Sequence, residues 1–329
     1  MTGFEELAES AGLEYVFDDM PGLRRVRRGN GFVYLDPAGE QVDDATRDWI
    51  RSLVIPPAWT DVWIAPSRKA HILATGRDKA GRKQYLYHPD WSEAAGDLKF
   101  SRMKTFSRHL PSLRRRVEAD LRRRELDQGK VAAIAVRVLD QTLIRVGNRR
   151  YATENGSFGL TTLEADHVEV SGSRVEFEFT GKGGAEHNLT IHDRRLATLV
   201  TRCQDLSGDT LFSFQDGDQV VSLTPGHLND YIAGLGRNRF TAKDFRTWGA
   251  SAAVTEAMAT GECELIAAID VAAERLGNTR AVCRSSYVHP IIEEAASDGR
   301  LEKAWRQSRD GRWLNRSESA LRRLVSADG

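Results

Sequence analysis

Two runs of the sequence carry side chains suited to chemistry on a phosphate group. The run TAKDFRTW contains Arg246, and the run LGNTRAVCRSSYVHP contains Asn278 and Tyr287. Tyrosine, whose ordinary pKa is about 10, is a poor nucleophile unless cationic donors stabilise its oxyanion and the charge on the group that it attacks. The two runs therefore indicate an enzyme that cuts nucleic acid through a covalent tyrosyl phosphate.

Two further residues complete this candidate set. Arg145, in QTLIRVGNRRY, is expected near the end of a helix that begins at about residue 131 and is capped by Gly147. Lys182 lies between glycines at a predicted hairpin tip. The guanidiniums of Arg145 and Arg246 can hold nonbridging phosphate oxygens and stabilise a pentacoordinate transition state. The Asn278 amide can donate to one oxygen, and the ammonium of Lys182 can protonate the departing 5′ oxygen.

Each of these residues, taken alone, also has a structural interpretation. An arginine in a last helical turn is ordinarily a partner of the helix dipole, and Arg246 could pair with a structural carboxylate. A tyrosine at a helix end is more often a core residue than a nucleophile. His289, in a His-Pro step, is more often structural than a general base. Only the assembled set supports catalysis.

The spacing of apolar residues predicts an α+β protein of two domains. Short alternating runs over 31–88, separated by Gly, Pro and charged turns, predict a small β-rich domain. Apolar residues then recur at three and four spacing over 103–126 and 130–146, which predicts a larger and mainly helical domain. The predicted domains are residues 1–93 and 94–329.

Local signals predict how the candidate residues are positioned. Three alternating runs predict a three-stranded β insertion in the helical domain, with Lys182 at its second turn. Thr241, with Asp244 three residues on, is expected to cap the helix that carries Arg246. Thr279 is expected to cap a short helix before the candidate nucleophile. The three runs are 167–170, 175–179 and 187–191.

Basic and aromatic residues interleave in GRDKAGRKQYLYH, at residues 76–88. This run is a candidate DNA-groove reader, in which Gln84 contacts a base edge while Tyr85 and Tyr87 contact phosphate or sugar. Alternation places both tyrosines on one face of a strand. The alternative interpretation of this run is an edge strand with solvated charges and a core aromatic. For the arginine-rich run PSLRRRVEADLRRRELDQ, which also carries four acids, we expect a solvated helix face.

Composition narrows the class of protein. The 47 basic and 47 acidic residues cancel, so no global charge excess announces a nucleic-acid partner. Cys203, Cys263 and Cys283 are odd in number and widely spaced, which argues against a disulfide framework and a zinc site. The start has neither a basic n-region nor an apolar h-region, and no apolar run approaches the length of a membrane span. A cytoplasmic protein is expected.

The order of these motifs resembles that of type IB DNA topoisomerases, specifically the compact bacterial and poxvirus-like branch. The resemblance runs from about residue 23 to residue 296, through IPPAWTDVWIAP, GRKQYLYH, IRVGN with RYATEN, FTGKGG, TAKDFRTW and LGNTRAVCRSSYVHP. It implies the catalytic fold shared with tyrosine recombinases and a catalytic set of Arg145, Lys182, Arg246, Asn278 and Tyr287. The DNA contacts that it implies are Arg82, Gln84, Tyr85, Tyr87, Arg150 and Tyr151.

The resemblance also implies an activity. Such an enzyme clamps double-stranded DNA as a monomer, nicks one strand through a 3′-phosphotyrosyl link, allows rotation and religates, so positive and negative supercoils relax. Because religation reverses the transesterification, no cofactor, ATP or metal ion is expected. A nucleoid-associated location follows.

One departure from the family pattern is Asn278, where poxvirus enzymes have His. Two other functions are alternatives to a topoisomerase. One is a tyrosine recombinase, which is disfavoured by Lys243 where recombinases typically have His, and the other is a catalytically idle DNA-binding protein.

Overall fold

The computed structural model describes residues 3–29, 31–206, 208–234, 240–261 and 263–327. The chain divides into two units, Met1–Phe100 and Ser101–Gly329, each with its own helices and antiparallel strands. The division falls within helix α3 (Pro89–Asp120), whereas the sequence placed the domain boundary after residue 93. The fold is therefore mixed α and β, as expected from the apolar spacing.

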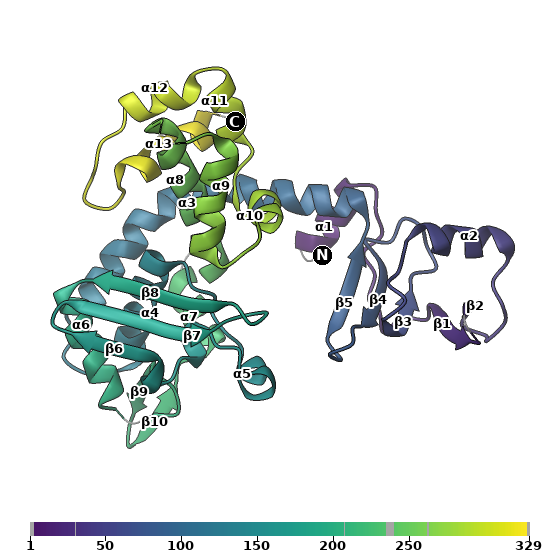
Figure 1. The fold of residues 1–329 in the computed structure, drawn as a ribbon, viewed down its shortest axis with the longest axis horizontal. Coiled ribbons are helices and arrows are strands. Elements are labelled where there is room, and N and C mark those ends of the chain that lie inside the picture. Colours follow the sequence, from purple (N-terminus) through teal and green to yellow (C-terminus); the bar gives the residue numbers. More distant parts are fainter. Residues whose placement is uncertain (1–2, 30, 207, 235–239, 262, 328–329) are drawn as a thin grey trace. The chain divides into compact units, whose positions relative to one another are not determined.

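Unit 1 is built on a five-stranded antiparallel sheet in the order β2-β1-β3-β4-β5 (Figure 1). Leu23, Ile64 and Ala74 from its strands pack with Ile50 of a helix in one apolar core. Four of the strands confirm the predicted runs, while β1 was missed because its sequence LRRVRR is dominated by arginine. The elements are α1 (Gly3–Ser10), β1 (Leu23–Arg28), β2 (Gly31–Leu35), α2 (Asp44–Ser52), β3 (Thr60–Ile64), β4 (Ile72–Arg77) and β5 (Lys83–Tyr87).

Unit 2 is mainly helical and contains two small sheets. The predicted three-stranded β insertion is confirmed as the antiparallel sheet β6-β7-β8, which contacts helices α4 and α6 (Figure 1). The helices after α3 are α4 (Gln128–Thr142), α5 (Arg149–Asn155), α6 (Arg194–Gln204), α7 (Pro225–Ala233), α8 (Ala242–Ala259), α9 (Leu265–Leu276), α10 (Arg280–Tyr287), α11 (Ile291–Ser297), α12 (Arg300–Arg306) and α13 (Arg316–Ala327). The strands are β6 (Val168–Ser171), β7 (Arg174–Thr180), β8 (Glu186–His192), β9 (Ser213–Asp216) and β10 (Gln219–Ser222), and two short 3₁₀ turns are Leu160–Thr162 and Ala165–His167.

An aromatic cluster fixes helix α8 in the core of unit 2. Phe245 and Trp248 of α8 are about 1% exposed and pack edge to face on Phe106 of α3, with ring centroids 5.4 and 6.2 Å apart. Aromatic side chains that bury this much surface dominate core packing. Because Phe245 and Trp248 flank Arg246 at one and two residues, their packing fixes the rotation of α8 about its axis and hence where Arg246 points.

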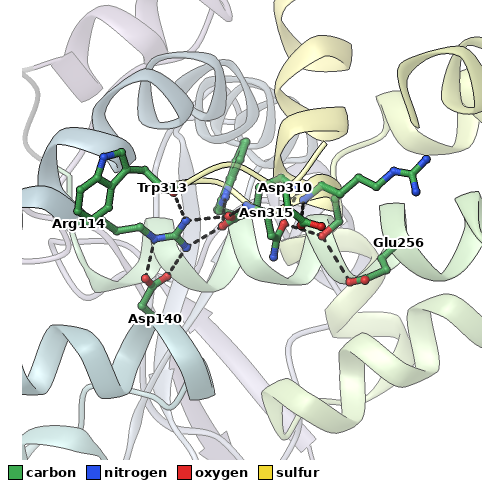
Figure 2. Close-up of polar contacts among 10 residues, drawn as sticks. Arg114, Asp140, Glu256, Asp310, Trp313 and Asn315 are labelled. Carbon is green, nitrogen blue, oxygen red and sulfur yellow. Dashed lines mark hydrogen bonds and ion pairs between the residues drawn. The ribbon is translucent and has the colours of Figure 1, made fainter. Parts of the chain in front are cut away.

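A buried ion-pair network ties α13, the last helix of unit 2, to three other helices, and Figure 2 labels Arg114 and Asp140 of this network. Arg114 of α3 donates to both oxygens of Asp140 on α4 and to both oxygens of Glu318 on α13, each at 2.7 Å. The Trp248 indole Nε1 of α8 donates to Glu318 at 3.0 Å. The expected solvated arginine face is therefore wrong for Arg114, because two carboxylates from distant parts of the chain cover it. These carboxylates hold the pKa of Arg114 above its ordinary value against the desolvation that lowers it.

The same correction applies to a second arginine of α3. Arg116 donates to the backbone carbonyl of Tyr231, and its guanidinium lies 4.5 Å from the centre of the Tyr231 ring. Both contacts join α3 to α7, so this side chain also belongs to the packing of unit 2. Over the whole described part of the chain, no helix is long and apolar enough to cross a membrane.

Candidate active site

Helix α8 buries the Arg246 guanidinium against the ends of two other helices. The Thr241 backbone N–H donates to the Asp244 carboxylate at 2.7 Å, which confirms the predicted capping of α8. Arg246 is only 4% exposed, and it donates to the carbonyl of Leu143 after α4 and, at 3.0 Å, to the carbonyl of Leu276 at the end of α9. Carbonyls at helix C-termini lack intrahelical partners and carry the negative end of the dipole, so they stabilise a buried guanidinium.

Arg145 lies in a loop beyond α4 and not in its last turn, so that prediction is wrong. The helix ends at Thr142, because Leu143 takes the left-handed conformation at φ 57° and closes the last turn through its N–H to Leu139. Gly147, the predicted helix cap, lies in the loop after α4 instead. It has φ 93°, and a Cβ there would lie 2.7 Å from Thr162 Oγ1, so only glycine fits this close approach.

Arg145 contacts the turn that follows α9. Its Nη1 donates to the Gly277 carbonyl at 3.1 Å, and its Nη2 donates to Oδ1 of Asn278. The two guanidiniums thus share the carbonyls at the end of α9, Arg246 on Leu276 and Arg145 on Gly277. This sharing brings Arg145 together with Arg246 and the candidate amide, both of which lie more than a hundred residues later in the sequence.

Two buried donors at this place have no partner among the described residues. They are Nε of Arg246 and the Nδ2 amide of Asn278. A buried donor left unpaired costs about 1–3 kcal/mol of folding free energy, and more when the group is charged. These two donors, one of them part of the Arg246 guanidinium, lie beside the Arg145 guanidinium and form a site suited to an anion with several oxygen acceptors, such as a phosphodiester.

Tyr287 is the last residue of α10 and lies beside Arg246. The Thr279 hydroxyl accepts from the Val282 N–H at 3.4 Å, which confirms the predicted helix cap. The Arg246 guanidinium carbon is 5.2 Å from the Tyr287 ring centre. Burial lowers the pKa of Arg246 below its ordinary value, while the neighbouring Tyr287 hydroxyl acts in the opposite direction. Arg246 therefore places a positive charge next to the side chain of the candidate nucleophile.

The backbone around Tyr287 is anchored to α8. The Ser251 hydroxyl donates to the Tyr287 carbonyl at 2.9 Å and accepts from the His289 N–H at 3.0 Å. The His289 ring accepts from the Ile291 N–H through Nδ1 at 3.1 Å, in keeping with its predicted structural role. One serine of α8 therefore fixes the segment on both sides of residue 288, on the same helix that carries Arg246.

Lys182 is exposed at the turn between β7 and β8. Gly183 and Gly184 have φ 80° and 78°, so the turn requires the two glycines that follow the lysine. Lys182 makes no hydrogen bond or ion pair with the other four candidate residues in the described part of the structure. The contacts given above thus join Arg145, Arg246, Asn278 and Tyr287, while Lys182 belongs to the adjacent hairpin.

The sequence did not single out His187, which lies beside this group. Its ring is half-buried and stacks on Phe179 across β7 and β8, with centroids 4.9 Å apart and an interplanar angle of 13°. Burial lowers the pKa of His187, and Arg145 and Arg246 lower it further. The alternation of the run 187–191 indicates that His187 points inward. It does not indicate that the ring would lie near Arg145 and Arg246.

The candidate DNA contacts lie in both units. In unit 1, Arg82 and Gln84 both donate to Asp78, at 2.8 and 2.9 Å, so one carboxylate holds them beside the β4–β5 turn. Tyr85 and Tyr87 confirm the predicted shared face, because their rings stack with centroids 5.8 Å apart and stay 44% and 42% exposed.

In unit 2, the two remaining candidate DNA contacts lie on the short helix α5. Arg150 pairs with Glu154 one turn on, at 2.9 Å, and Tyr151 is 46% exposed. Among the residues that the structure describes, no group of three or more His, Cys, Asp or Glu side chains is arranged to hold a metal ion.

Comparison with known proteins gives matches over most of the chain. Residues 90–298 match the family model of the eukaryotic DNA topoisomerase I catalytic core, and residues 31–78 match that of the bacterial DNA topoisomerase IB N-terminal domain. DNA topoisomerase 1B of Acanthamoeba polyphaga mimivirus is 31% identical over 287 residues, which cover 82% of this chain and 85% of the viral protein. DNA topoisomerase 1B of vaccinia virus (strain Copenhagen) is 24% identical over 283 residues, covering 80% and 86%.

Proposed function

The chain belongs to the type IB DNA topoisomerases, and from this premise we propose that it relaxes positively and negatively supercoiled duplex DNA through a transient 3′-phosphotyrosyl link. One strand is nicked, the DNA rotates about the other strand, and the nick is religated. The observation that supports the site is the pair of unpartnered buried donors, on Arg246 and Asn278, beside Tyr287. We further propose that the enzyme acts as a monomer in association with the nucleoid.

In the proposed cleavage step, the Tyr287 oxygen forms a bond to phosphorus and the bond from phosphorus to the 5′ oxygen breaks. Tyr287 gives up its proton to water as it attacks, beside the Arg246 guanidinium. Arg145, Arg246 and the Asn278 amide donate to nonbridging oxygens and stabilise the charge that builds there. Lys182 gives a proton to the 5′ oxygen, which then leaves as a hydroxyl. Religation is the reverse reaction, so the phosphodiester energy is conserved.

A plasmid relaxation assay in EDTA without ATP tests the function itself. We expect full relaxation of both positively and negatively supercoiled plasmid, because the proposed chemistry uses only side chains. No relaxation under these conditions would refute the proposal. Resolved or integrated products would instead favour the strand transferase chemistry of a tyrosine recombinase.

Replacement of Tyr287 tests the nucleophile. Tyr287→Phe should abolish relaxation and the covalent adduct while leaving noncovalent DNA binding intact, because only the attacking oxygen is removed. The matched control is Tyr34→Phe in β2, which should relax plasmid like the wild type. The readouts are plasmid relaxation, denaturing gels of protein trapped on a labelled strand, and a binding titration. An adduct that survives in Tyr287→Phe would assign the nucleophile to another residue.

Replacement of Lys182 tests the general acid. Lys182→Ala should cleave an ordinary strand about 10²–10⁴-fold more slowly, the usual contribution of a positioned acid. A strand with a 5′-sulfur at the scissile bond should restore the rate, since a thiolate leaves without a proton. A variant that stays equally slow on both strands would remove Lys182 from this role.

Both units are expected to contribute DNA contacts. Arg82, Tyr85 and Tyr87 in unit 1 and Arg150 and Tyr151 in unit 2 are the proposed phosphate and sugar contacts, and Gln84 is the proposed base contact. Phosphate contacts release counterions, so affinity should fall as salt rises. Arg150→Ala should weaken binding to all sequences and flatten the salt dependence, measured by titration of one duplex from about 50 to 200 mM salt.

A further inference from the structure

The ring of His187 separates two backbone segments that carry proposed catalytic residues. On one side is Gly181, immediately before Lys182, where an added Cβ would lie 2.6 Å from Cδ2 and 2.7 Å from Nε2 of the ring. On the other side is Gly277, immediately before Asn278, where an added Cβ would lie 2.5 Å from Cε1 and 3.0 Å from Nε2. Such distances are shorter than van der Waals contact, so the Nε2 edge of the ring touches both backbones.

Packing within the hairpin holds the ring in this place. Along β8, His187, Leu189 and Ile191 point inward while their neighbours are exposed, and His187 is the inward residue closest to the turn. The ring stacks on Phe179, which is 4% exposed, and the two residues are directly paired across β7 and β8. A flat ring stacked on a buried neighbour has little freedom, so it sets a fixed spacing between the two glycine backbones.

The surroundings of this ring favour its neutral form. The charged groups that act on it are Arg145, Arg246 and Glu186, and burial together with the two arginines lowers the pKa of His187 while Glu186 alone raises it. A neutral imidazole adds no third positive charge next to the guanidiniums. It therefore acts on the site through its shape and position.

We propose that His187 is a positioning residue, which seats the hairpin that carries Lys182 against the turn between α9 and α10 that carries Asn278. The geometry supports this directly, since one ring touches the residue before each of them. The inference rests on the proposed roles of Lys182 and Asn278. The chemical consequence of the proposal is specific: without the ring the hairpin loses this contact with the turn, and Lys182 is displaced from the departing 5′ oxygen. A displacement of about 1 Å can slow a reaction about 100-fold.

The first test compares His187→Ala with wild type on two strands. We expect His187→Ala to cleave an ordinary strand about 10- to 100-fold more slowly and to recover on a strand with a 5′-sulfur leaving group, as expected for a misplaced acid. His192→Ala, at the exposed end of the same strand β8, is the matched control and should cleave both strands like the wild type. A His187→Ala enzyme that is equally slow on both strands, or not slow at all, would overturn the proposal.

The second test is a double-mutant cycle. If His187 acts through Lys182, the variant with both residues changed to alanine should cleave no more slowly than Lys182→Ala alone. Multiplied effects of the two substitutions would show that His187 acts on another group. This outcome is distinct from a failure of the proposed function, which would appear as no plasmid relaxation by the wild-type enzyme. It is also distinct from a failure of the role of Lys182, which would appear as the absence of sulfur rescue in Lys182→Ala itself.

Gly181→Ala provides an independent perturbation should His187→Ala not fold. Gly181 has an ordinary backbone conformation, so its new methyl group acts mainly by pushing on the His187 ring. We expect slow cleavage of the ordinary strand and recovery on the sulfur strand, with normal DNA binding. Wild-type cleavage by Gly181→Ala would show that the contact between hairpin and ring does not position Lys182.

Discussion

Glu318 provides the sharpest stability prediction, because one carboxylate satisfies donors from two other helices and from the residue that precedes α13. It is 5% exposed, accepts twice from Arg114, and accepts from the Trp248 indole and from the Asn315 backbone N–H. Glu318→Ala removes all of these acceptors at once. The perturbation reaches α8, where Trp248 lies two residues beyond Arg246, so folding and activity can both be measured.

The expected loss of stability in Glu318→Ala follows from the hydrogen bonds that remain after the substitution. Breaking a buried ion pair typically costs about 3–5 kcal/mol, because the remaining charge is left without its partner. Asp140 still neutralises Arg114 through two bonds of 2.7 Å, which reduces this cost. The Trp248 N–H, however, becomes an unpaired buried donor at about 1–3 kcal/mol. We therefore expect Glu318→Ala to lower the free energy of unfolding of unit 2 by about 3–5 kcal/mol.

Urea denaturation monitored by circular dichroism measures this loss, with Glu302→Ala as control. Glu302 pairs with Arg306 at 3.7 Å on the exposed face of α12, with both side chains more than 70% exposed, so its loss should cost less than about 1 kcal/mol. Glu318→Gln keeps an acceptor for Trp248 and should fall between the two. A Glu318→Ala protein within about 1 kcal/mol of wild type would refute the reasoning that this network stabilises unit 2.

Three further predictions concern the site, DNA binding and pH. Arg246→Lys should slow strand cleavage about 10²–10³-fold in single-turnover assays with DNA affinity retained, because an ammonium cannot reproduce the fork that contacts Leu143 and Leu276. Asp78→Asn should tighten DNA binding several-fold at low salt, since it frees the guanidinium of Arg82 from its ion pair; equal affinity would show that this arginine does not contact DNA. Burial lowers the pKa of His71, so below pH 6.5 the unfolded chain binds a proton that the folded chain does not, and stability falls as pH falls. His71→Asn should therefore lose less stability than wild type between pH 7.5 and 5.5 in urea titrations, and an equal loss would exclude this histidine as the cause.

Local signals in the sequence predicted much of the scaffold of the candidate site. The alternation of the three insertion strands and the glycines around Lys182 predicted its hairpin, because a period of two and positive φ angles are properties of short segments. Thr241 with Asp244 and Thr279 predicted two helix starts, since capping depends on residues three apart.

Features that depend on distant partners were missed or misjudged. The end of α4 was placed too late because Leu143 takes the left-handed conformation that sequence statistics reserve for glycine, and Gly147 lay nearby. Strand β1 was missed because its four arginines mask its pairing with β2 and β3. Arg114 was assigned to a solvated face because the carboxylates that cover it come from α4 and α13.

The sequence by itself determined which chemical groups the protein carries and the local turns and helix ends on which they lie. It also carried enough ordered motifs to identify the family. The tertiary structure alone decided that Arg145 and Arg246 share the carbonyls at the end of α9, that two donors there stay unpaired, and that His187 lies between Gly181 and Gly277. The physical reason is range: capping and alternation act over a few residues, whereas burial, ion pairing and close packing join segments that only folding brings together.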